Sequence, residues 1–374
     1  MKIAIEAQRI FRRDKHGMDF VALETIRELQ KREDKNEYFV IVAPGEDRCL
    51  EESHNLSIIE LKCPTYPLWE QIALPWVVKQ LGVDVLHCTS NTAPLWCPVP
   101  LVLTLHDIIY LNTSKEKGMS PYQELGWYYR KMIVPAIVKK CRRIITVSQT
   151  ESQNVVQYFP SIKGKLQVIH NSYSPSYHPI ENYQAVTHRY LSGNSYLLCL
   201  GNTDPRKNVR ATLLAYALYR ERSLYKSPLI LTGLTADTVH AMLESLHLAA
   251  CKDYIICPGY VPGDDLPALY SGAFAFLFPS ISEGFGIPIL EAMACGTPVI
   301  TSNVSAMPEV AGPEGLLINP EKPEEITDVL LHLESDRPFY LHQKEYGLQR
   351  AKDFSWRKSV AELVKIYQAI PNQH

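Results

Sequence analysis

Short apolar runs, each ending in a polar or glycine turn, recur along the chain with helical stretches between them. Six of these runs lie in the first half of the chain: "KIAIEA", "YFVIVA", "DVLHCT", "LVLTLHD", "RIITVS" and "LQVIHN". Six more lie in the second half: "YLLCLGN", "PLILTG", "YIICPGY", "AFAFLFPS", "PVITS" and "GLLIN". Continuous apolar strands that alternate with helices are typical of parallel sheets covered on both faces. The pattern predicts an α/β protein with two doubly wound, Rossmann-like domains.

A segment rich in Ser, Tyr, Pro and Asn, residues 172–195, separates the two sets of runs. Such a composition is typical of a connection between domains. We therefore predict an N-terminal domain over residues 1–175, a C-terminal domain over 176–355, and a last helical segment over 356–374. That segment is compatible with packing on either domain, including back on the first. Ligands of doubly wound sheets bind at the carboxyl ends of the strands, so chemistry is expected in the loops that follow them.

Composition and charge narrow the range of partners. The 374 residues are 46% hydrophobic and 21% charged, as in an ordinary globular protein. A formal net charge of -2 gives no electrostatic reason to expect a nucleic-acid partner. Nine cysteines without a C-x-x-C pair predict reduced thiols. The N-terminus, "MKIAIEAQRIF", is too short and polar for a secretory signal, and no apolar run reaches the roughly 18–20 residues of a membrane span. These features predict a cytoplasmic protein.

The run "AFAFLFPS" leads into a glycine-rich loop, "ISEGFGIP", and then into an apolar helix, "PILEAMAC". Pro288 suits the first position of that helix, and Gly296 suits its end. Backbone amides near Gly286 and Ile287 would point out of the helix start, where the helix dipole favours an anion. Glu291 is unusual because the residues around it leave the helix almost no polar face.

Two simpler interpretations of this stretch fit the residues less well. In the first, the glycines form a tight turn and Glu291 is solvated. In the second, the stretch is a dinucleotide-binding fingerprint, G-x-G-x-x-G, but its third glycine is replaced by Ile289 and the next strand, "PVITSNV", lacks the expected acid.

Glu283, "GFG", Glu291 and the trailing "GTPVI" together resemble the E-x7-E region of the retaining glycosyltransferases of family four (group 1), which have the GT-B fold. The segments "SAMPEVAG" (305–312) and "GLLINP" (315–320) match the next segments of that family in order. The resemblance is strong over 196–320 and weak in the first half. It implies two Rossmann-like domains that face each other across a cleft. Within the family the chain is most similar to bacterial mannosyltransferases that build O-antigen or capsule.

The resemblance assigns roles to this stretch. Glu291 accepts hydrogen bonds from the ribose hydroxyls of a nucleotide diphosphate sugar, since one carboxylate can hold two vicinal hydroxyls. Glu283 lies by the donor sugar and orients its hydroxyls. The amides of Phe285, Gly286 and Ile287 contact the sugar and the diphosphate.

A basic pair follows the first strand of the second half, in "YLLCLGNTDPRKNV". The family uses an Arg and a Lys here to bind the departing diphosphate, and Lys207 matches its lysine. The commonest form has the arginine directly after the strand glycine, where this chain has Asn202. Arg206 is therefore the counterpart, and Asn202 is kept among the donor-binding residues. Fixed cations stabilise the leaving group without a metal, so we predict metal-independent transfer with no cofactor.

The first half contributes two further residues by resemblance. His106, in "LVLTLHD", matches a family histidine that lies near the donor sugar. In the family this histidine donates a hydrogen bond toward the transferred sugar or toward neighbouring backbone groups. Without that context, a lone histidine is usually structural. Gly17, in "HGMDFVALETIREL", matches the glycine of a loop that approaches the diphosphate, although Met18 and Asp19 depart from the family pattern. Ser148 and Asn171, at strand ends, are expected to line the cleft.

The sequence thus predicts a retaining transferase that moves a hexose, mannose from GDP-mannose, to a saccharide or lipid-linked saccharide in cell-surface polysaccharide synthesis. Two alternatives stay open: a nucleotide-sugar epimerase or hydrolase of the same architecture, and a non-catalytic nucleotide-sugar-binding subunit. The basic segment 128–143 also has two interpretations. It is either a solvated helix or a peripheral contact with anionic lipid at the inner face of the cell membrane.

Overall fold

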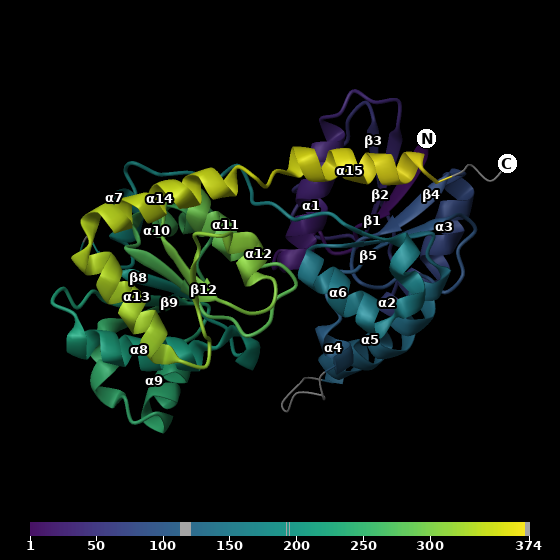
Figure 1. The fold of residues 1–374 in the computed structure, drawn as a ribbon. Helices are drawn as coiled ribbons and strands as arrows, with labels where there is room; N and C mark the ends of the chain where they lie inside the picture. The colour runs from purple at the N-terminus through teal and green to yellow at the C-terminus, as the bar shows by residue number, and fades with distance from the viewer. Residues whose placement is uncertain (113–120, 192, 194, 371–374) are drawn as a thin grey trace. The chain divides into compact units, whose positions relative to one another are not determined.

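The computed structural model describes residues 1–112, 121–191, 193 and 195–370. The chain forms two compact units (Figure 1). Unit 1 consists of residues 1–172 and 355–374, and unit 2 of residues 173–354. Each unit has its own parallel sheet, which confirms the prediction of two doubly wound α/β domains. The last four residues of the segment predicted over 356–374 lie outside the described residues.

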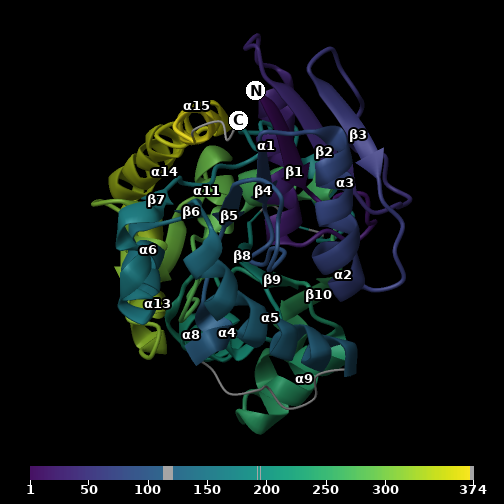
Figure 2. The same ribbon diagram turned by 90° about the vertical axis from the view of Figure 1, so that its right-hand side faces the viewer.

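The sheet of unit 1 has seven parallel strands in the order β3-β2-β1-β4-β5-β6-β7, which Figure 2 shows side by side. The strands are β1 (Lys2–Glu6), β2 (Glu37–Val42), β3 (Leu56–Glu60), β4 (Val85–Cys88), β5 (Leu101–Thr104), β6 (Arg143–Thr146) and β7 (Leu166–Val168). Strand β3 was not among the six predicted for this half. It lies at the sheet edge and is mostly half-exposed, so it does not need the continuous apolar run that marks a buried strand.

Helices cover both faces of this sheet. They are α1 (Gly17–Gln30), α2 (Tyr66–Leu68), the π-helix η1 (Trp69–Ala73), α3 (Leu74–Leu81), α4 (Ile109–Asn112), α5 (Pro121–Lys140), α6 (Gln149–Tyr158), the 3-10 helix η2 (Pro160–Lys165) and α15 (Trp356–Gln368). Successive strand residues point to opposite faces. Ile3 accordingly packs in a core with α1 and α15, whereas Ala4 packs in a core with α3 and α5.

Helix α15 comes from the end of the chain but belongs to unit 1. Its apolar residues, among them Val360, Leu363 and Val364, are buried against the face that α1 also covers. Two polar contacts secure it: the Tyr367 hydroxyl lies 2.6 Å from His87 Nδ1, and the Ser359 hydroxyl donates to the carbonyl of His170 at 2.6 Å.

Unit 2 has six parallel strands in the order β10-β9-β8-β11-β12-β13. They are β8 (Leu197–Leu200), β9 (Leu229–Thr232), β10 (Ile255–Gly259), β11 (Ala275–Phe278), β12 (Val299–Ser302) and β13 (Leu316–Ile318). These are the six runs predicted from the apolar pattern. Strands β9, β11 and β12 are buried throughout, whereas the edge strands β10 and β13 are partly exposed.

The helices of unit 2 are α7 (Gln184–Thr187), η3 (Pro205–Lys207), α8 (Val209–Arg222), α9 (Ala236–Ser245), η4 (Ala249–Tyr254), η5 (Gly263–Asp265), α10 (Leu266–Gly272), α11 (Ile287–Ala294), α12 (Met307–Ala311), α13 (Pro323–Ser335) and α14 (Arg337–Ala351). Among the described residues, no helix is both long enough and apolar enough to cross a membrane. All nine cysteines are free thiols.

Candidate functional site

The strand order of unit 2 reverses at β8. The chain first adds β9 and β10 on one side of β8 and then places β11 on the other side. The carboxyl ends of β8 and β11 therefore flank the topological switch point, which is where open α/β sheets bind ligands. The loops that leave these two strands carry the predicted residues Asn202, Arg206, Lys207 and Glu283.

The loop after β8 is held firmly at this point. Asn208 has a left-handed backbone, with φ of 55°, and its side-chain amide donates to the carbonyls of Pro279 (3.0 Å) and Pro320 (2.9 Å). One side chain thus ties together the loops that follow β8, β11 and β13. The residue before it, Lys207, is thereby fixed at the carboxyl edge of the sheet.

Lys207 and Glu283 meet across the switch point. Lys207 Nζ lies 2.6 Å from Glu283 Oε1, and the two side chains are only 28% and 15% exposed. The ammonium also lies 5.3 Å from the centre of the Phe278 ring. The Ser305 hydroxyl fixes the backbone of Glu283 by accepting from its N–H at 3.1 Å and donating to its carbonyl at 2.8 Å. The structure therefore brings together a cation and a carboxylate that lie far apart in the sequence.

The other predicted residues after β8 have different surroundings. The Arg206 guanidinium pairs with Asp204. The backbone carbonyl of Arg206 accepts from the Ile281 N–H at 2.7 Å, and this bond links the two switch-point loops. The Asn202 side chain accepts from the Asp204 N–H at 2.9 Å and so shapes the turn. Both residues stay predictions as donor ligands.

Helix α11 begins at the glycine-rich loop. Gly286 stands at its N-cap with a φ of 101°, a left-handed backbone that favours glycine, and Pro288 lies in the first turn. Because Gly286 has no side chain, no side chain caps the helix start. Phe285 is buried against Phe354, and Ile287 is the first helical residue. The helix ends before Gly296, which also has a left-handed backbone.

Glu291 lies on α11 with two tyrosines against its carboxylate. The Tyr270 hydroxyl donates to Glu291 Oε2 at 3.2 Å, and Tyr177 lies close enough to the same carboxylate to favour its ionised form. Burial raises the pKa of Glu291 to about 7, and the two tyrosines act in the opposite direction. Glu291 is therefore neither a solvated helix residue nor a core residue. Neither tyrosine was predicted, since they precede Glu291 by 114 and 21 positions and match no motif.

Asp264 and Asp265 follow β10. Asp265 stands at the N-cap position of α10, but its side chain does not cap the helix. It binds Arg189 at 2.6 Å and the hydroxyl of Tyr190 instead. Among the described residues there is no group of three His, Cys, Asp or Glu side chains arranged to hold a metal ion. Metal independence stays a prediction.

In unit 1 the strand order reverses between β1 and β4, which places the topological switch point of this sheet there. Gly17 begins α1, and Asp19 forms its N-terminal cap by accepting from the His16 N–H at 2.9 Å. The other oxygen of Asp19 pairs with Arg9 Nε at 2.9 Å, and Asp19 is buried. The acid that departs from the family pattern is thus neutralised by a neighbouring arginine, whose role the sequence did not reveal.

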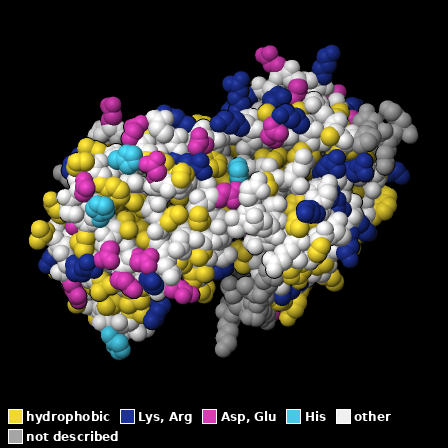
Figure 3. Space-filling view, in the orientation of Figure 1, with side chains coloured by type: hydrophobic (Ala, Val, Ile, Leu, Met, Phe, Trp, Pro, Cys, Tyr) yellow, Lys and Arg dark blue, Asp and Glu magenta, His cyan; other side chains and the backbone are white. Residues whose placement is uncertain are grey.

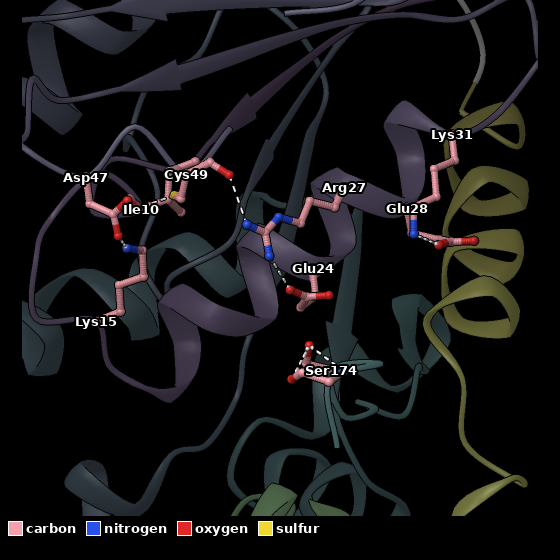
Figure 4. Close-up of polar contacts among 10 residues, drawn as sticks. Ile10, Lys15, Glu24, Arg27, Glu28, Lys31, Asp47, Cys49 and Ser174 are labelled. Carbon is pink, nitrogen blue, oxygen red and sulfur yellow. Dashed lines mark hydrogen bonds and ion pairs between the residues drawn. The ribbon is translucent and has the colours of Figure 1, made fainter. Parts of the chain in front are cut away.

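The segment before Gly17 is tied to the loop after β2. Lys15 pairs with Asp47, and the thiol of Cys49 contacts the carbonyl of Ile10 (Figure 4). Arg27 of α1 reaches the same loop and donates to the carbonyl of Cys49 at 3.0 Å. These contacts link the approach to Gly17 with the loop after β2.

His106 follows β5 and is buried. Its Nε2 lies 2.8 Å from the carbonyl of Thr89, and a carbonyl only accepts, so Nε2 carries the proton. Burial lowers the pKa of His106 to about 4, which leaves the ring neutral and Nδ1 an acceptor. The proton of His106 is thus directed to the backbone. The ring lines a pocket of unit 1 together with Asn171.

Two buried carboxylates of unit 1 were also missed. Glu6, the last residue of β1, accepts from the N–H groups of Gln8 (3.0 Å) and Thr89 (3.2 Å), and burial raises its pKa to about 7. Glu70, in η1, accepts from Tyr66 at 2.6 Å and from three further side chains. The available signal was an acid inside an apolar stretch, as with Glu291. Ser148 caps α6 by accepting from the Glu151 N–H at 3.0 Å.

Comparison with known proteins identifies the family. Residues 16–177 match Glycosyltransferase Family 4, and residues 188–350 match Glycosyl transferases group 1. O-antigen chain mannosyltransferase B of Escherichia coli is 33% identical over 272 residues, which cover 72% of this chain and 70% of that protein. The chain is a group 1, family 4 glycosyltransferase. Enzymes of this class transfer a sugar from a nucleotide-sugar donor to a saccharide acceptor.

Other relatives agree with this assignment. Serotype-specific mannosyltransferase WbdA of Escherichia coli is 30% identical over 268 residues, 69% of this glycosyltransferase but only 32% of WbdA. Among solved structures, Anabaena HepE in complex with UDP and glucose has a TM-score of 0.76 at 17% identity, with 99% of this chain and 100% of HepE covered. Sucrose-phosphate synthase of Thermosynechococcus elongatus has a TM-score of 0.74 at 18% identity, with 98% of each chain covered. The glycosyltransferase thus has the GT-B fold, as predicted.

Proposed function

We propose that this glycosyltransferase moves mannose from GDP-mannose to a saccharide or lipid-linked saccharide during synthesis of a cell-surface polysaccharide. The relatives that are 33% and 30% identical are both named as mannosyltransferases, and one of them as an enzyme of the O-antigen chain. The fold alone does not select the base, because HepE has the same fold and its structure contains UDP and glucose.

The observation that carries the proposal is the group of side chains at the switch point of unit 2. Lys207 offers a positive charge to the diphosphate, Glu283 offers a carboxylate to the sugar hydroxyls, and Glu291 offers a second carboxylate to the ribose. Lys207 and Glu283 neutralise each other in the structure. A bound donor would supply both with new partners, because the diphosphate is anionic and the sugar carries hydroxyls.

We propose further that transfer retains the anomeric configuration. The bond between the anomeric carbon and the diphosphate breaks, the acceptor oxygen bonds to the same face, and its proton passes to the departing diphosphate. Lys207 stabilises the charge that develops on the leaving group, which is the step that a fixed cation accelerates.

Thermal protection by free nucleotides tests the donor assignment, because a ligand that binds the native state raises the melting temperature. GDP should protect the protein more than UDP does at equal concentration. With GDP-mannose and an acceptor, NMR of the product should show the α configuration of the donor. Stronger protection by UDP would overturn GDP-mannose, and an inverted product would overturn retention.

Incubation with the donor alone separates the proposal from its alternatives. A transferase should release GDP slowly until an acceptor is added. Fast release of GDP or an isomerised donor without acceptor would instead favour a hydrolase or epimerase, and tight binding with no turnover on any acceptor would favour a binding subunit.

We also propose a peripheral contact of unit 1 with the inner face of a cell membrane, through residues 128–143. Two facts support it. Tyr128 and Met132 on α5 are 55% and 70% exposed, and Lys139, Lys140 and Arg142 are exposed at the end of the same segment. Figure 3 shows hydrophobic and basic side chains side by side on the surface of this unit. Exposed aromatic and apolar residues beside basic ones are typical of helices that lie on anionic lipid.

A further inference from the structure

Two tyrosines from different parts of unit 2 contact the Glu291 carboxylate. Tyr270 lies on α10, is fully buried, and donates its hydroxyl to Glu291 Oε2 at 3.2 Å. Tyr177 lies in the segment between β7 and α7, close enough to the same carboxylate to favour its ionised form. The two rings meet edge to face, with their centres 5.9 Å apart and their planes at 61°. One phenol thus donates to the carboxylate, and the second packs on the first beside it.

The segment that carries Tyr177 is fastened to the helix that carries Tyr270. The Ile180 N–H donates to the Ser271 hydroxyl at 3.0 Å, and that hydroxyl donates to the carbonyl of Pro267 at 2.8 Å. Ser271 follows Tyr270 directly on α10. The two phenols are consequently held at a fixed spacing on one frame, whereas Glu291 comes from a separate helix, α11.

The hydrogen-bond capacity of the carboxylate explains why two donors are useful. An ionised carboxylate has about four lone-pair sites and donates nothing. When each of the two phenols donates to one site, two sites remain. A vicinal diol such as the 2′- and 3′-hydroxyls of a ribose needs two acceptor sites at a defined spacing. The number of remaining sites therefore matches the number of hydroxyl groups that this ligand presents.

We propose that Tyr177 and Tyr270 are positioning residues of the donor site, which orient the Glu291 carboxylate so that its two remaining lone-pair sites receive the ribose hydroxyls. This inference rests on the proposed function, since it takes a nucleotide diphosphate sugar as the ligand. Neither tyrosine acts on the reacting atoms. They contribute to donor affinity and to the selection of ribose over deoxyribose.

The same contacts set the protonation of Glu291. Burial favours the neutral acid, whereas the two phenols favour the carboxylate, and the pKa of about 7 is the balance. The other titratable groups near this cluster are Cys295, at the end of α11, and Asp264, from η5, which acts on Tyr177. Removal of one phenol removes a contribution that lowers the pKa of Glu291. The pH below which nucleotide binding weakens should then move upward.

Calorimetric titration of the intact protein with GDP and with 2′-deoxy-GDP, from pH 6 to 9, tests the inference. Tyr177→Phe should weaken GDP binding about tenfold at pH 7, as expected for loss of a hydrogen bond to a charged group. The same substitution should weaken the binding of 2′-deoxy-GDP less than that of GDP, so that the preference for ribose falls. The pH below which GDP binding weakens should also rise. Tyr270→Phe should act in the same direction.

The matched control is Tyr190→Phe, from the same connecting segment. Tyr190 also donates its hydroxyl to a carboxylate, that of Asp265, which has no place in the proposed site. The Tyr190→Phe variant should have the same affinity for GDP, the same preference for ribose and the same pH dependence of binding as the unaltered protein. Equal binding by Tyr177→Phe and Tyr190→Phe would overturn the inference, as would tighter binding by Tyr177→Phe, because Tyr177 would then obstruct the site.

The Glu291→Gln variant separates failure of the positioning role from failure of the proposed function. If Glu291→Gln weakens GDP binding and Tyr177→Phe does not, only the positioning role fails. If the unaltered protein binds neither GDP nor UDP, or if Glu291→Gln binds them normally, the proposed function fails and the positioning role fails with it. A lower melting temperature of Tyr177→Phe with unchanged affinity would mark Tyr177 as merely structural.

Discussion

Lys207 and Glu283 are separated by 76 positions in the sequence and by 2.6 Å in the structure. Each is partly buried, and each neutralises the other. The pair keeps a cation and a carboxylate at the switch point without the cost of two unpaired charges. At the residue scale, the switch point therefore holds the two kinds of group that the proposed donor requires, a cation for the diphosphate and a carboxylate for the sugar hydroxyls.

Removal of either partner should have a distinct effect. Lys207→Ala should weaken GDP binding and lower kcat by about 10²- to 10³-fold, because a fixed charge no longer stabilises the leaving group. Glu283→Ala should leave GDP binding intact and lose turnover. The exposed Arg210, at the start of α8, provides the control, and Arg210→Ala should behave as the unaltered protein. Equal loss of GDP binding in the Lys207 and Arg210 variants would contradict this assignment.

The sequence identified the members of this group that lie within one motif. Glu283 and Glu291 stand eight positions apart and Lys207 follows a strand end, so pattern and family resemblance were sufficient to single them out. Tyr177, Tyr270 and the Arg9–Asp19 pair escaped, because their partners are set by the packing of separate segments. A tyrosine or an arginine that serves a carboxylate looks, in sequence, like any other.

At the element scale, the helix from α2 through η1 to α3 has an apolar face toward solvent. Leu68, Ile72 and Trp76 are 43%, 63% and 59% exposed. Residues four apart in an α-helix drift by about 40° around the axis. A π turn has more residues per turn, so η1 offsets the drift and keeps the three side chains in line. The buried side of the same π turn carries Glu70, whose hydrogen-bond partners include Thr92 and Tyr129 from outside this helix.

This face adjoins the segment proposed to meet the membrane. Gln71 donates to the Tyr129 hydroxyl on α5 at 2.7 Å and accepts from the Leu95 N–H at 2.9 Å, while Lys140 donates to the carbonyl of Leu95 at 2.6 Å. The exposed Trp96 follows directly. The two helices and this loop therefore present apolar and basic side chains from neighbouring positions.

Vesicle co-sedimentation tests the contact. The protein should bind vesicles that contain phosphatidylglycerol and lose binding as salt rises, since anionic lipid attracts the exposed lysines. Trp76→Ser should weaken binding about tenfold or more, because burial of one large apolar side chain contributes about 1.5–3 kcal/mol. Leu224→Ser, at a residue of unit 2 that is 93% exposed, is the control. Equal effects of the two substitutions would count against the proposed surface.

Strands were predicted well where the sequence contains a continuous apolar run. Inner strands such as β8 and β11 have such runs because they are buried. The edge strands β7 and β10 are only half-buried, but their sequences are still apolar. The edge strand β3 is interrupted by Ser57 and ends in Glu60, and the π turn at Glu70 departs from the helical period that an apolar pattern can reveal.

At the scale of the whole molecule, α15 closes a unit that begins at the other end of the chain. Tyr367 is fully buried, and its hydroxyl is a partner of His87 inside the core of unit 1. His87 also contacts the Thr104 hydroxyl at 2.8 Å, and burial lowers its pKa to about 3. The stability of unit 1 therefore depends on residues close to the C-terminus.

Denaturation can follow this dependence unit by unit. All five tryptophans lie in unit 1, at positions 69, 76, 96, 127 and 356, so tryptophan fluorescence reports that unit alone. Tyr367→Ala should destabilise unit 1 by about 3–5 kcal/mol, the usual cost of emptying a large aromatic site. The exposed Tyr225 of unit 2 is the control. A fluorescence transition that is unchanged in Tyr367→Ala would show that α15 does not support unit 1.

The return of the chain to unit 1 in α15 has a consequence for synthesis. The sheet of unit 1 is complete once β7 has been made, but the face next to Ile145 and His87 stays uncovered until α15 has left the ribosome. At about 5–20 residues per second, translation of residues 173–354 takes roughly 10–40 s, far longer than a helix needs to form. Unit 2 is continuous in sequence and can fold as it emerges. The second half of the chain is therefore finished first, and the first half waits with an open core for the last residues to arrive.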